Sequence, residues 1–289
     1  MNHEASSLAV AQGWPARQVM SFDQLYDEIR TTTACRAKSI AWRGLARASW
    51  QLETTIDRAL TRCARDESYE QWLGREQAVI ARFREEGAPY ARSIEEAYLR
   101  NIWNLLALGR HCGLPTRLLD WTHSPWVAAW FASHEHSDTD GVIWWFNDNE
   151  FEQVIHEAWD GWRVPTRSQY YGRVREMGTP EVVAGTDPRV LEATAFDPSG
   201  APWISKIHYE PTFPRMAAQQ AFMTACGCLR KTHNEAIDKV PNNAQIERGR
   251  IVIPGHLKGD VRARLKEMNI NATSLHYPAL DIVARRIDV

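Results

Sequence analysis

The sequence of 289 residues contains few cysteines, and they follow no repeated spacing. They are Cys35, Cys63, Cys112, Cys226 and Cys228, and the last two are separated by a single residue. Cysteine pairs that hold structural zinc are spaced more widely, and a disulfide scaffold is normally built from an even number. The cysteines therefore favour free thiols in a reducing compartment.

Long apolar runs and long basic runs are also missing. No apolar stretch approaches the roughly 18 residues that span a bilayer, and the first residues lack a basic region leading into an apolar core. The formal net charge is −2, which argues against a dominant electrostatic grip on duplex nucleic acid. We expect a cytoplasmic protein with no membrane partner, and local contacts with a nucleotide stay open.

Two hydrolase signatures are absent. The sequence has no G-x-S-x-G run, which forms a nucleophile elbow, and no H-E-x-x-H run, which holds catalytic zinc. No cysteine lies in a recognisable nucleophile motif. These absences argue against serine, cysteine and zinc hydrolases, and we expect no metal cofactor.

The composition that remains is that of a globular protein, with 44% hydrophobic and 24% charged residues. Apolar spacing and capping residues predict helices over 22–30, 68–86, 93–113, 125–132, 151–159, 257–268 and 278–287. Buried or alternating runs predict strands over 39–44, 116–122, 141–146, 203–211 and 250–254, with one helical turn and then a strand over 214–227. We expect the strand over 141–146 to pair beside the one over 116–122. The pattern indicates one α+β domain with a mixed β core.

The stretch "HCGLPTRLLDWTHSPWVAAWFA", residues 111–132, places two charged groups beside several tryptophans. Ionised groups next to large apolar side chains are costly unless they are paired or face a cleft. Arg117 and Asp120 are three apart on a predicted strand, so they point to opposite faces and have different partners. Asp120 is a candidate to tie down the turn before the next helix or to pair with Arg43, while Ser124 and Pro125 match an N-cap and first helical residue.

Several motifs together resemble the FRG domain, a bacterial family named for an aromatic-Arg-Gly triplet. They are "AWRG", "GLPTRLLDWTHSPWVAAWFA", "RMAAQQAFMTACG" and the closing "VIPGHLKGDVRARLKEMNINATSLHYPALDIVARRI". The likeness runs from about residue 20 to 288. It implies a single domain with a helical insertion at about 66–113 and a loop-rich insertion at about 147–202. The chain departs from the family at Arg110, which precedes His111 where Gln-His is usual, and at Trp42, which replaces phenylalanine or tyrosine.

A more distant resemblance is to the ADP-ribosyltransferase fold, in the order of an early arginine, a strand ending in "T-x-S" before an "A-x-x-FA" helix, and a late polar residue. The resemblance implies that NAD is the substrate and that Arg43, Thr122, Ser124 and Gln219 converge around one hollow. The residues that it implies for NAD binding are Arg43, Gly44, Arg117, Trp121, Thr122 and Ser124. The fold type expected is α+β with an ADP-ribosyltransferase-like core, a helical insertion and C-terminal helices.

The implied chemistry needs a negative charge near the reacting carbon. Cleaving the nicotinamide bond creates an oxocarbenium-like centre, which a carboxylate stabilises. Gln219 stands where a late glutamate is usual, and its amide carries no charge. The implied catalytic set is therefore Arg43, Gln219 and Asp120, with Glu210 as another candidate carboxylate.

Two functions follow from these residues. The first is an NAD-using ADP-ribosyltransferase or NAD glycohydrolase that acts as a bacterial toxin or phage-defence effector on a protein or nucleic-acid acceptor. The alternative is a non-catalytic module that binds a nucleotide or a nucleic-acid end in the same cleft.

Overall fold

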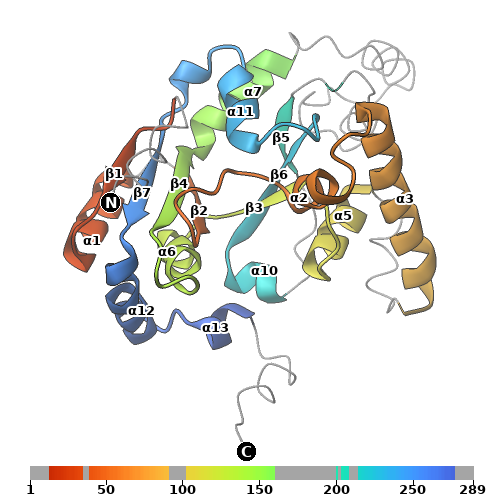
Figure 1. Ribbon diagram of the computed structural model, residues 1–289. Coiled ribbons are helices and arrows are strands. Elements are labelled where there is room, and N and C mark those ends of the chain that lie inside the picture. The colour runs from red at the N-terminus through yellow and green to blue at the C-terminus, as the bar shows by residue number, and fades with distance from the viewer. Residues whose placement is uncertain are drawn as a thin grey trace, which may run out of the picture.

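The computed structural model describes residues 13–34, 39–90, 102–159, 200, 203–207 and 214–276. These residues form a mixed sheet of seven strands with helices on both faces (Figure 1). The strands are β1 (Ala16–Gln18), β2 (Ile40–Leu45), β3 (Leu118–Thr122), β4 (Gly141–Asn147), β5 (Ile204–Ile207), β6 (Ala221–Cys226) and β7 (Arg248–Ile253). They lie in the order β1-β7-β4-β2-β3-β6-β5, and β1 is parallel to β7 while the other neighbours are antiparallel.

The pairing of β2 decides the centre of the sheet. β2 pairs with β4 along its whole length, from Ile40 opposite Asn147 to Leu45 opposite Val142. The predicted pairing of β4 directly beside β3 is wrong, because β2 lies between them. This neighbour comes from far earlier in the chain, so the local pattern of hydrophobic residues carried no sign of it.

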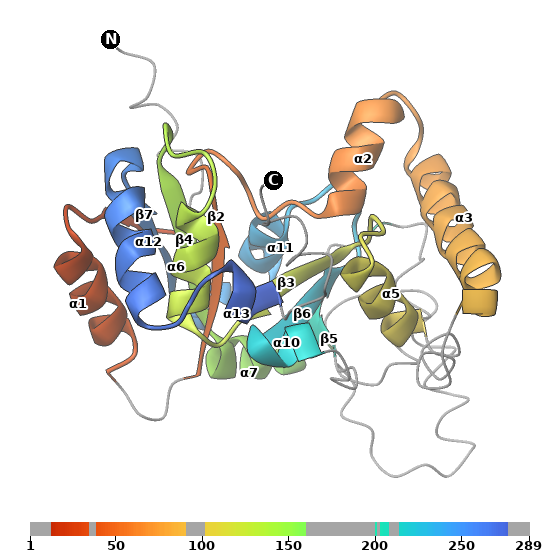
Figure 2. The same cartoon turned by 90° about the horizontal axis from the view of Figure 1, so that it is seen from below.

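One face of the β7-β4-β2 half is covered by α1 (Phe22–Thr32), α6 (Pro125–Ser133) and α12 (Lys258–Glu267), which lie side by side in Figure 2. Helix α6 lies almost directly on the backbone of the sheet. A Cβ atom at Gly44 would come within 1.8 Å of the Ala128 carbonyl oxygen, and one at Gly141 within 2.1 Å of the Ala132 oxygen. The small side chains of Ala128 and Ala132 in α6 allow this close approach.

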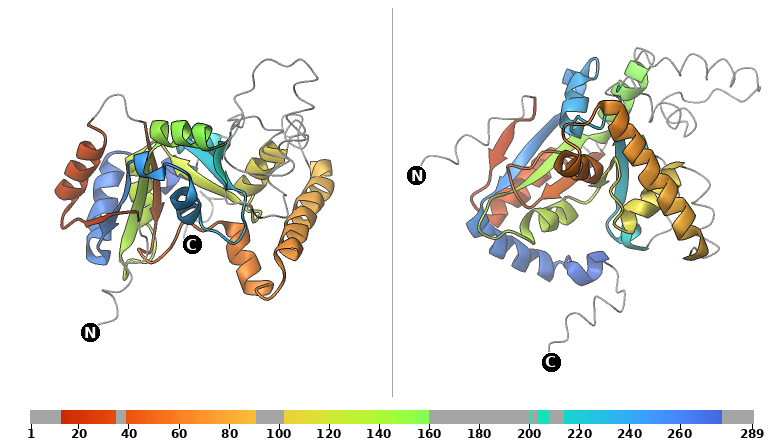
Figure 3. Two further views of the ribbon diagram at one scale, coloured as in Figure 1. Left: turned by 90° about the horizontal axis from the view of Figure 1, so that it is seen from above. Right: turned by 45° about the vertical axis from the view of Figure 1, so that its right-hand side comes forward.

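The opposite face carries α7 (Asp148–Trp159) and α11 (His233–Lys239), seen near the viewer in the left panel of Figure 3. Their apolar side chains join those of the sheet in one buried cluster. Trp121 packs edge-on against Phe146 at 4.7 Å between ring centroids, and Phe146 contacts Phe151 of α7 at 4.8 Å. Successive residues of a strand point to opposite faces, so Trp121 belongs to this core whereas Asp120 and Thr122 face the other side.

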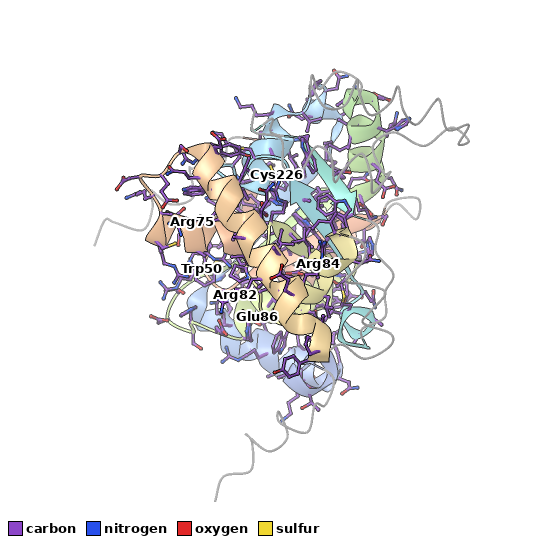
Figure 4. All side chains as sticks on the ribbon, turned by 90° about the vertical axis from the view of Figure 1, so that its right-hand side faces the viewer. Trp50, Arg75, Arg82, Arg84, Glu86 and Cys226 are labelled. Atoms are coloured by element: carbon purple, nitrogen blue, oxygen red, sulfur yellow. The ribbon has the colours of Figure 1, made fainter. Side chains whose placement is uncertain are left out.

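The β3-β6-β5 half of the sheet is flanked by α2 (Thr55–Cys63), α3 (Tyr69–Gly87) and α5 (Ile102–His111). Figure 4 looks onto α3, which lies across this end of the molecule with Arg75, Arg82 and Glu86 labelled along it. The remaining helices are α10 (Pro214–Ala218) and α13 (Ala272–His276), with 3-10 turns at Ala88–Tyr90, Asn243–Gln245 and Gly255–Leu257. Apolar residues of α5 and α3 pack with β3, β5 and β6 in a second cluster.

The structure confirms most of the predicted elements. They could be predicted because capping residues mark their ends. Ser68 and Gln71 form the predicted capping box of α3, and Ser124 caps α6 ahead of Pro125. The short elements β1, α2, α11 and α13 were not predicted. The predicted helix starting at 93, the helix over 278–287, Glu210 and most of the loop-rich insertion at 147–202 lie outside the described residues.

The mixed α/β class is confirmed, while the ADP-ribosyltransferase-like type stays a prediction. In the part of the chain that the structure describes, no helix has the length and apolar character needed to cross a membrane.

Candidate functional site

A cavity of about 410 Å³ opens on the face of the sheet between α6 and α5. Its floor is formed by the middle of the sheet, with Trp42 and Gly44 from β2, Asp120 and Thr122 from β3, and Met223 from β6. Its walls come from the end of α5, one side of α6 and the turn after α10. The size lies in the range of small-molecule sites, which is roughly 300–1,000 Å³.

The floor is split because β2 and β3 share only one registered pair, Trp42 opposite Thr122. Beyond that pair the guanidinium of Arg43 takes the place of a strand partner, and its Nη1 donates a hydrogen bond to the backbone carbonyl of Asp120. Trp42 and Gly44 point toward α6, so Arg43 starts from the opposite face and reaches the cavity through the split. Burial lowers the pKa of Arg43 to about 10, and the group stays charged at neutral pH.

Asp120 binds two arginines. Its Oδ2 accepts hydrogen bonds from Nη2 and Nε of Arg110 at 2.7 and 3.0 Å, and it lies 3.7 Å from Nη1 of Arg43. The charge of Asp120 raises the pKa of Arg110. Arg110 is held in turn by Thr55, whose hydroxyl accepts from Nη1 at 3.0 Å. Two fixed cations and one carboxylate give the cavity a net positive wall.

The turn residues of the predicted site serve mainly to join elements. Thr122 donates through its hydroxyl to the backbone carbonyl of Gln219 at 2.6 Å and accepts from the Ser124 amide at 3.0 Å. The Gln219 side chain donates to the carbonyl of Leu275 in α13 at 3.1 Å. Thr122 and Gln219 line the cavity; Ser124 does not, and its hydroxyl accepts from the Val127 amide as the N-cap of α6.

Trp121 lines the cavity but is oriented by the far face of the sheet. Its indole Nε1 donates to the hydroxyl of Thr224 at 2.9 Å, and that hydroxyl lies 2.8 Å from Nδ1 of His233. His233 is fully buried, and burial together with the charge of Arg43 lowers its pKa to about 3. A neutral imidazole therefore lies behind the split.

Arg117 lies away from the cavity in the protein interior. It is 1% exposed and pairs with Glu76 of α3, which is also 1% exposed, with Nε 2.8 Å from Oε1. A second donor, Nη1, reaches the carbonyl of Cys226 at 3.2 Å. Arg117 and Asp120 thus have different partners on opposite sides of the chain, as their spacing predicted.

The structure brings together six of the eight predicted site residues around the cavity, namely Arg43, Gly44, Asp120, Trp121, Thr122 and Gln219. It adds lining residues that sequence reasoning did not place there, including Arg110, His111, Val127, Phe131, Met216 and Met223. The sequence did mark Arg110 as unusual, because it stands where the FRG family usually has glutamine. The apolar residues had none, since their spacing is that of any packed helix or strand.

Comparison with known proteins supports one assignment. Residues 38–141 match the family model of the FRG domain, a span that includes Arg43, Arg110, Asp120 and Thr122 but not Gln219. No curated protein and no solved structure matches the chain. The chain therefore contains an FRG domain, whose Trp42-Arg43-Gly44 triplet lies at the split in the sheet.

Proposed function

We propose that the cavity between α5 and α6 binds NAD, and that the protein cleaves the bond between nicotinamide and ribose. The observation that carries the proposal is the convergence of Arg43, Arg110 and Asp120 on one cavity whose other walls include Trp42 and Phe131. Guanidinium groups pair with phosphate oxygens and stay charged, and aromatic walls accept planar rings. The single FRG domain that we infer to extend over about 20–288 contributes both sides of this cavity.

Asp120 is the group that we assign to the reacting centre. In the proposed step the ribose C1′–N bond breaks, and its electron pair leaves with the nicotinamide. An oxygen nucleophile, from water or an acceptor, then forms the new bond to C1′ and loses its proton. A carboxylate stabilises the positive charge that develops on the sugar, whereas the uncharged amide of Gln219 orients a neighbouring hydroxyl.

A second candidate function is binding without chemistry. The contacts of Asp120 favour it, because Arg43 and Arg110 already offset the negative charge that would stabilise the reacting sugar. In that case the cavity holds a nucleotide or a nucleic-acid end, and the phosphate groups bind to Arg43 and Arg110.

The cellular role that we propose for the enzyme is that of a bacterial toxin or phage-defence effector. This role rests on the resemblance of the chain to the FRG family. The acceptor of the transferred ADP-ribosyl group is a protein or a nucleic acid. A cell that expresses the active protein is then expected to lose growth, while one that expresses the Asp120→Asn variant grows normally.

The test is incubation of the purified protein with NAD, followed by mass analysis of the small molecules and of the protein. We expect released nicotinamide, which Asp120→Asn lowers by a hundredfold or more and the exposed control Arg82→Gln leaves unchanged. Thermal stabilisation by NAD without nicotinamide release supports the binding module instead. A protein that neither gains stability from NAD nor turns it over refutes the NAD-cleaving function, and one that gains no stability from any nucleotide counts against the binding module as well.

A further inference from the structure

A second cavity of about 250 Å³ lies between α2, α3 and the loop that joins β6 to α11. It shares no lining residue with the cavity between α5 and α6. Helix α2 lies next to both: Thr55 in its first turn holds Arg110, and Asp57 two residues later lines the second cavity. Because the two cavities share no lining residue, a mutation can alter the lining of one without altering the lining of the other.

The inner end of this cavity carries a buried carboxyl group. Asp57 is only 6% exposed, and its Oδ2 accepts a hydrogen bond from the hydroxyl of Thr54. Its Oδ1 is buried and has no hydrogen-bond partner among the described residues. Buried polar atoms are nearly always paired, so an unpaired one on a residue that lines a cavity indicates a missing partner.

The outer end of the cavity carries three cations. Arg65 and Lys231 are exposed at its mouth, and the guanidinium of Arg230 lies 4.7 Å from the ring centre of Trp72. Stacking on the indole holds the planar guanidinium in place, which lowers the entropy lost when it binds an oxyanion. Thr61, Thr232 and one further carboxylate residue, Glu53, also line this cavity.

We propose that this second cavity binds a small phosphorylated sugar. The phosphate binds to Arg65, Arg230 and Lys231, because these three cations outweigh the charge of Glu53 on the same lining and guanidinium groups match the geometry of a phosphate. A sugar hydroxyl supplies the hydrogen bond that Oδ1 of Asp57 lacks. The cavity is smaller than the first one, which suits a sugar phosphate better than a dinucleotide.

Isothermal titration calorimetry with ribose 5-phosphate tests the proposal, with inorganic phosphate and ribose as separate titrants. We expect ribose 5-phosphate to bind at least tenfold more tightly than either component. Asp57→Leu removes both carboxyl oxygens at a similar side-chain size and is expected to reduce this advantage over inorganic phosphate. Arg230→Ala combined with Lys231→Ala is expected to weaken binding of ribose 5-phosphate tenfold or more.

Two further variants serve as controls, one for loss of an exposed cation on α3 and one for the proposed NAD site. Arg82→Ala removes an exposed cation elsewhere on α3 (Figure 4) and should bind ribose 5-phosphate as the unmodified chain does. Arg43→Gln alters only the first cavity and should also leave this binding unchanged. The proposal is overturned if the unmodified chain binds ribose 5-phosphate no more tightly than inorganic phosphate. It is equally overturned if the double variant, shown by circular dichroism to be folded, binds it as well as the unmodified chain.

Discussion

Two sets of arginine–carboxylate contacts serve different purposes. One involves Arg117, immediately before β3, and the other involves Asp120, three residues later within β3. Arg117 and Glu76 are both 1% exposed and pair with each other across two parallel donor–acceptor contacts. Asp120 keeps 34% of its side chain exposed and is shared between Arg110 and Arg43 at the wall of a cavity. The first pair joins α3 to the sheet, whereas the second set leaves charged groups where a ligand can reach them.

The difference lies in the surroundings rather than in the residue types. A buried ion pair costs desolvation on both partners, so its removal from one side leaves an uncompensated charge. A half-exposed pair at a cavity is solvated in part, and its removal costs less stability. Mutation of Glu76 should therefore reduce stability more than mutation of Asp120 does. Mutation of Asp120 should have the larger effect on ligand chemistry.

The largest effect is expected at Glu76. Glu76→Gln leaves Arg117 charged and buried without its partner, which should lower the free energy of unfolding by about 3–5 kcal/mol. Denaturant unfolding measures this loss. A cost below about 1 kcal/mol, the value typical of a surface pair, would contradict the distinction between the two regions.

The next largest effect is expected at the buried residue Asp57, where mutation should change how folding stability depends on pH. Burial raises its pKa from 3.8 to about 8, while the hydrogen bond from Thr54 and the charge of Arg117 oppose the shift. The folded chain therefore holds a proton that the unfolded chain has lost, so stability falls as pH rises from about 4 toward 8. In Asp57→Asn this dependence is lost.

From pH 6 to pH 8 the stability difference between the unmodified chain and Asp57→Asn should change by about 2 kcal/mol, since one pKa unit corresponds to about 1.4 kcal/mol. Denaturant unfolding of both proteins across this range gives the comparison. Parallel pH profiles for the two proteins would show that Asp57 does not carry the proton.

A smaller stability effect is expected at Asp120, where function should change most. Asp120→Asn removes a half-exposed charge and should cost about 1 kcal/mol of stability, because the amide oxygen still accepts a hydrogen bond from Arg110. Release of nicotinamide from NAD should fall by a hundredfold or more if the carboxylate stabilises the reacting centre. A variant that unfolds as readily as Glu76→Gln would remove the contrast between the two sets.

The smallest effect is expected at Arg82, whose ion pair with Glu86 is exposed on α3. Arg82→Ala should leave the denaturant midpoint of unfolding unchanged, because an exposed ion pair between residues four apart on a helix contributes little to stability. Nicotinamide release should not change. A loss of stability as large as that of Glu76→Gln would mean that the exposed pair on α3 supports the helix as much as its buried pair does.

The elements with clear end signals were predictable because capping chemistry is local. Ser68 with Gln71, and Ser124 with Pro125, satisfy backbone groups within a few residues of themselves. Short elements such as α2 and α11 carry the same kind of cap at Thr54 and Thr232, but their apolar faces are too brief to show a helical period. Their presence was decided by the core that they cover.

The candidate site was predictable in its residues more than in its geometry. The motifs around Arg43 and Asp120 marked both residues, and the spacing of Arg117 and Asp120 correctly separated their partners. Nothing in that spacing identified Glu76, which lies 41 positions from Arg117. The N-cap role of Ser124 was predicted from its place before Pro125, whereas the resemblance also assigned Ser124 to the cavity, which it does not line.

The sequence by itself determined the class of the fold, the positions of most helices and strands, and the charged residues that had to find partners, because these depend on contacts within a few residues. Only the tertiary structure decided that β2 enters between β3 and β4 and separates from β3 after a single pair. That split lets the Arg43 side chain pass through the sheet to Asp120. Pairing between distant strands depends on which surfaces bury each other best in the folded chain, and no local pattern of residues encodes that choice.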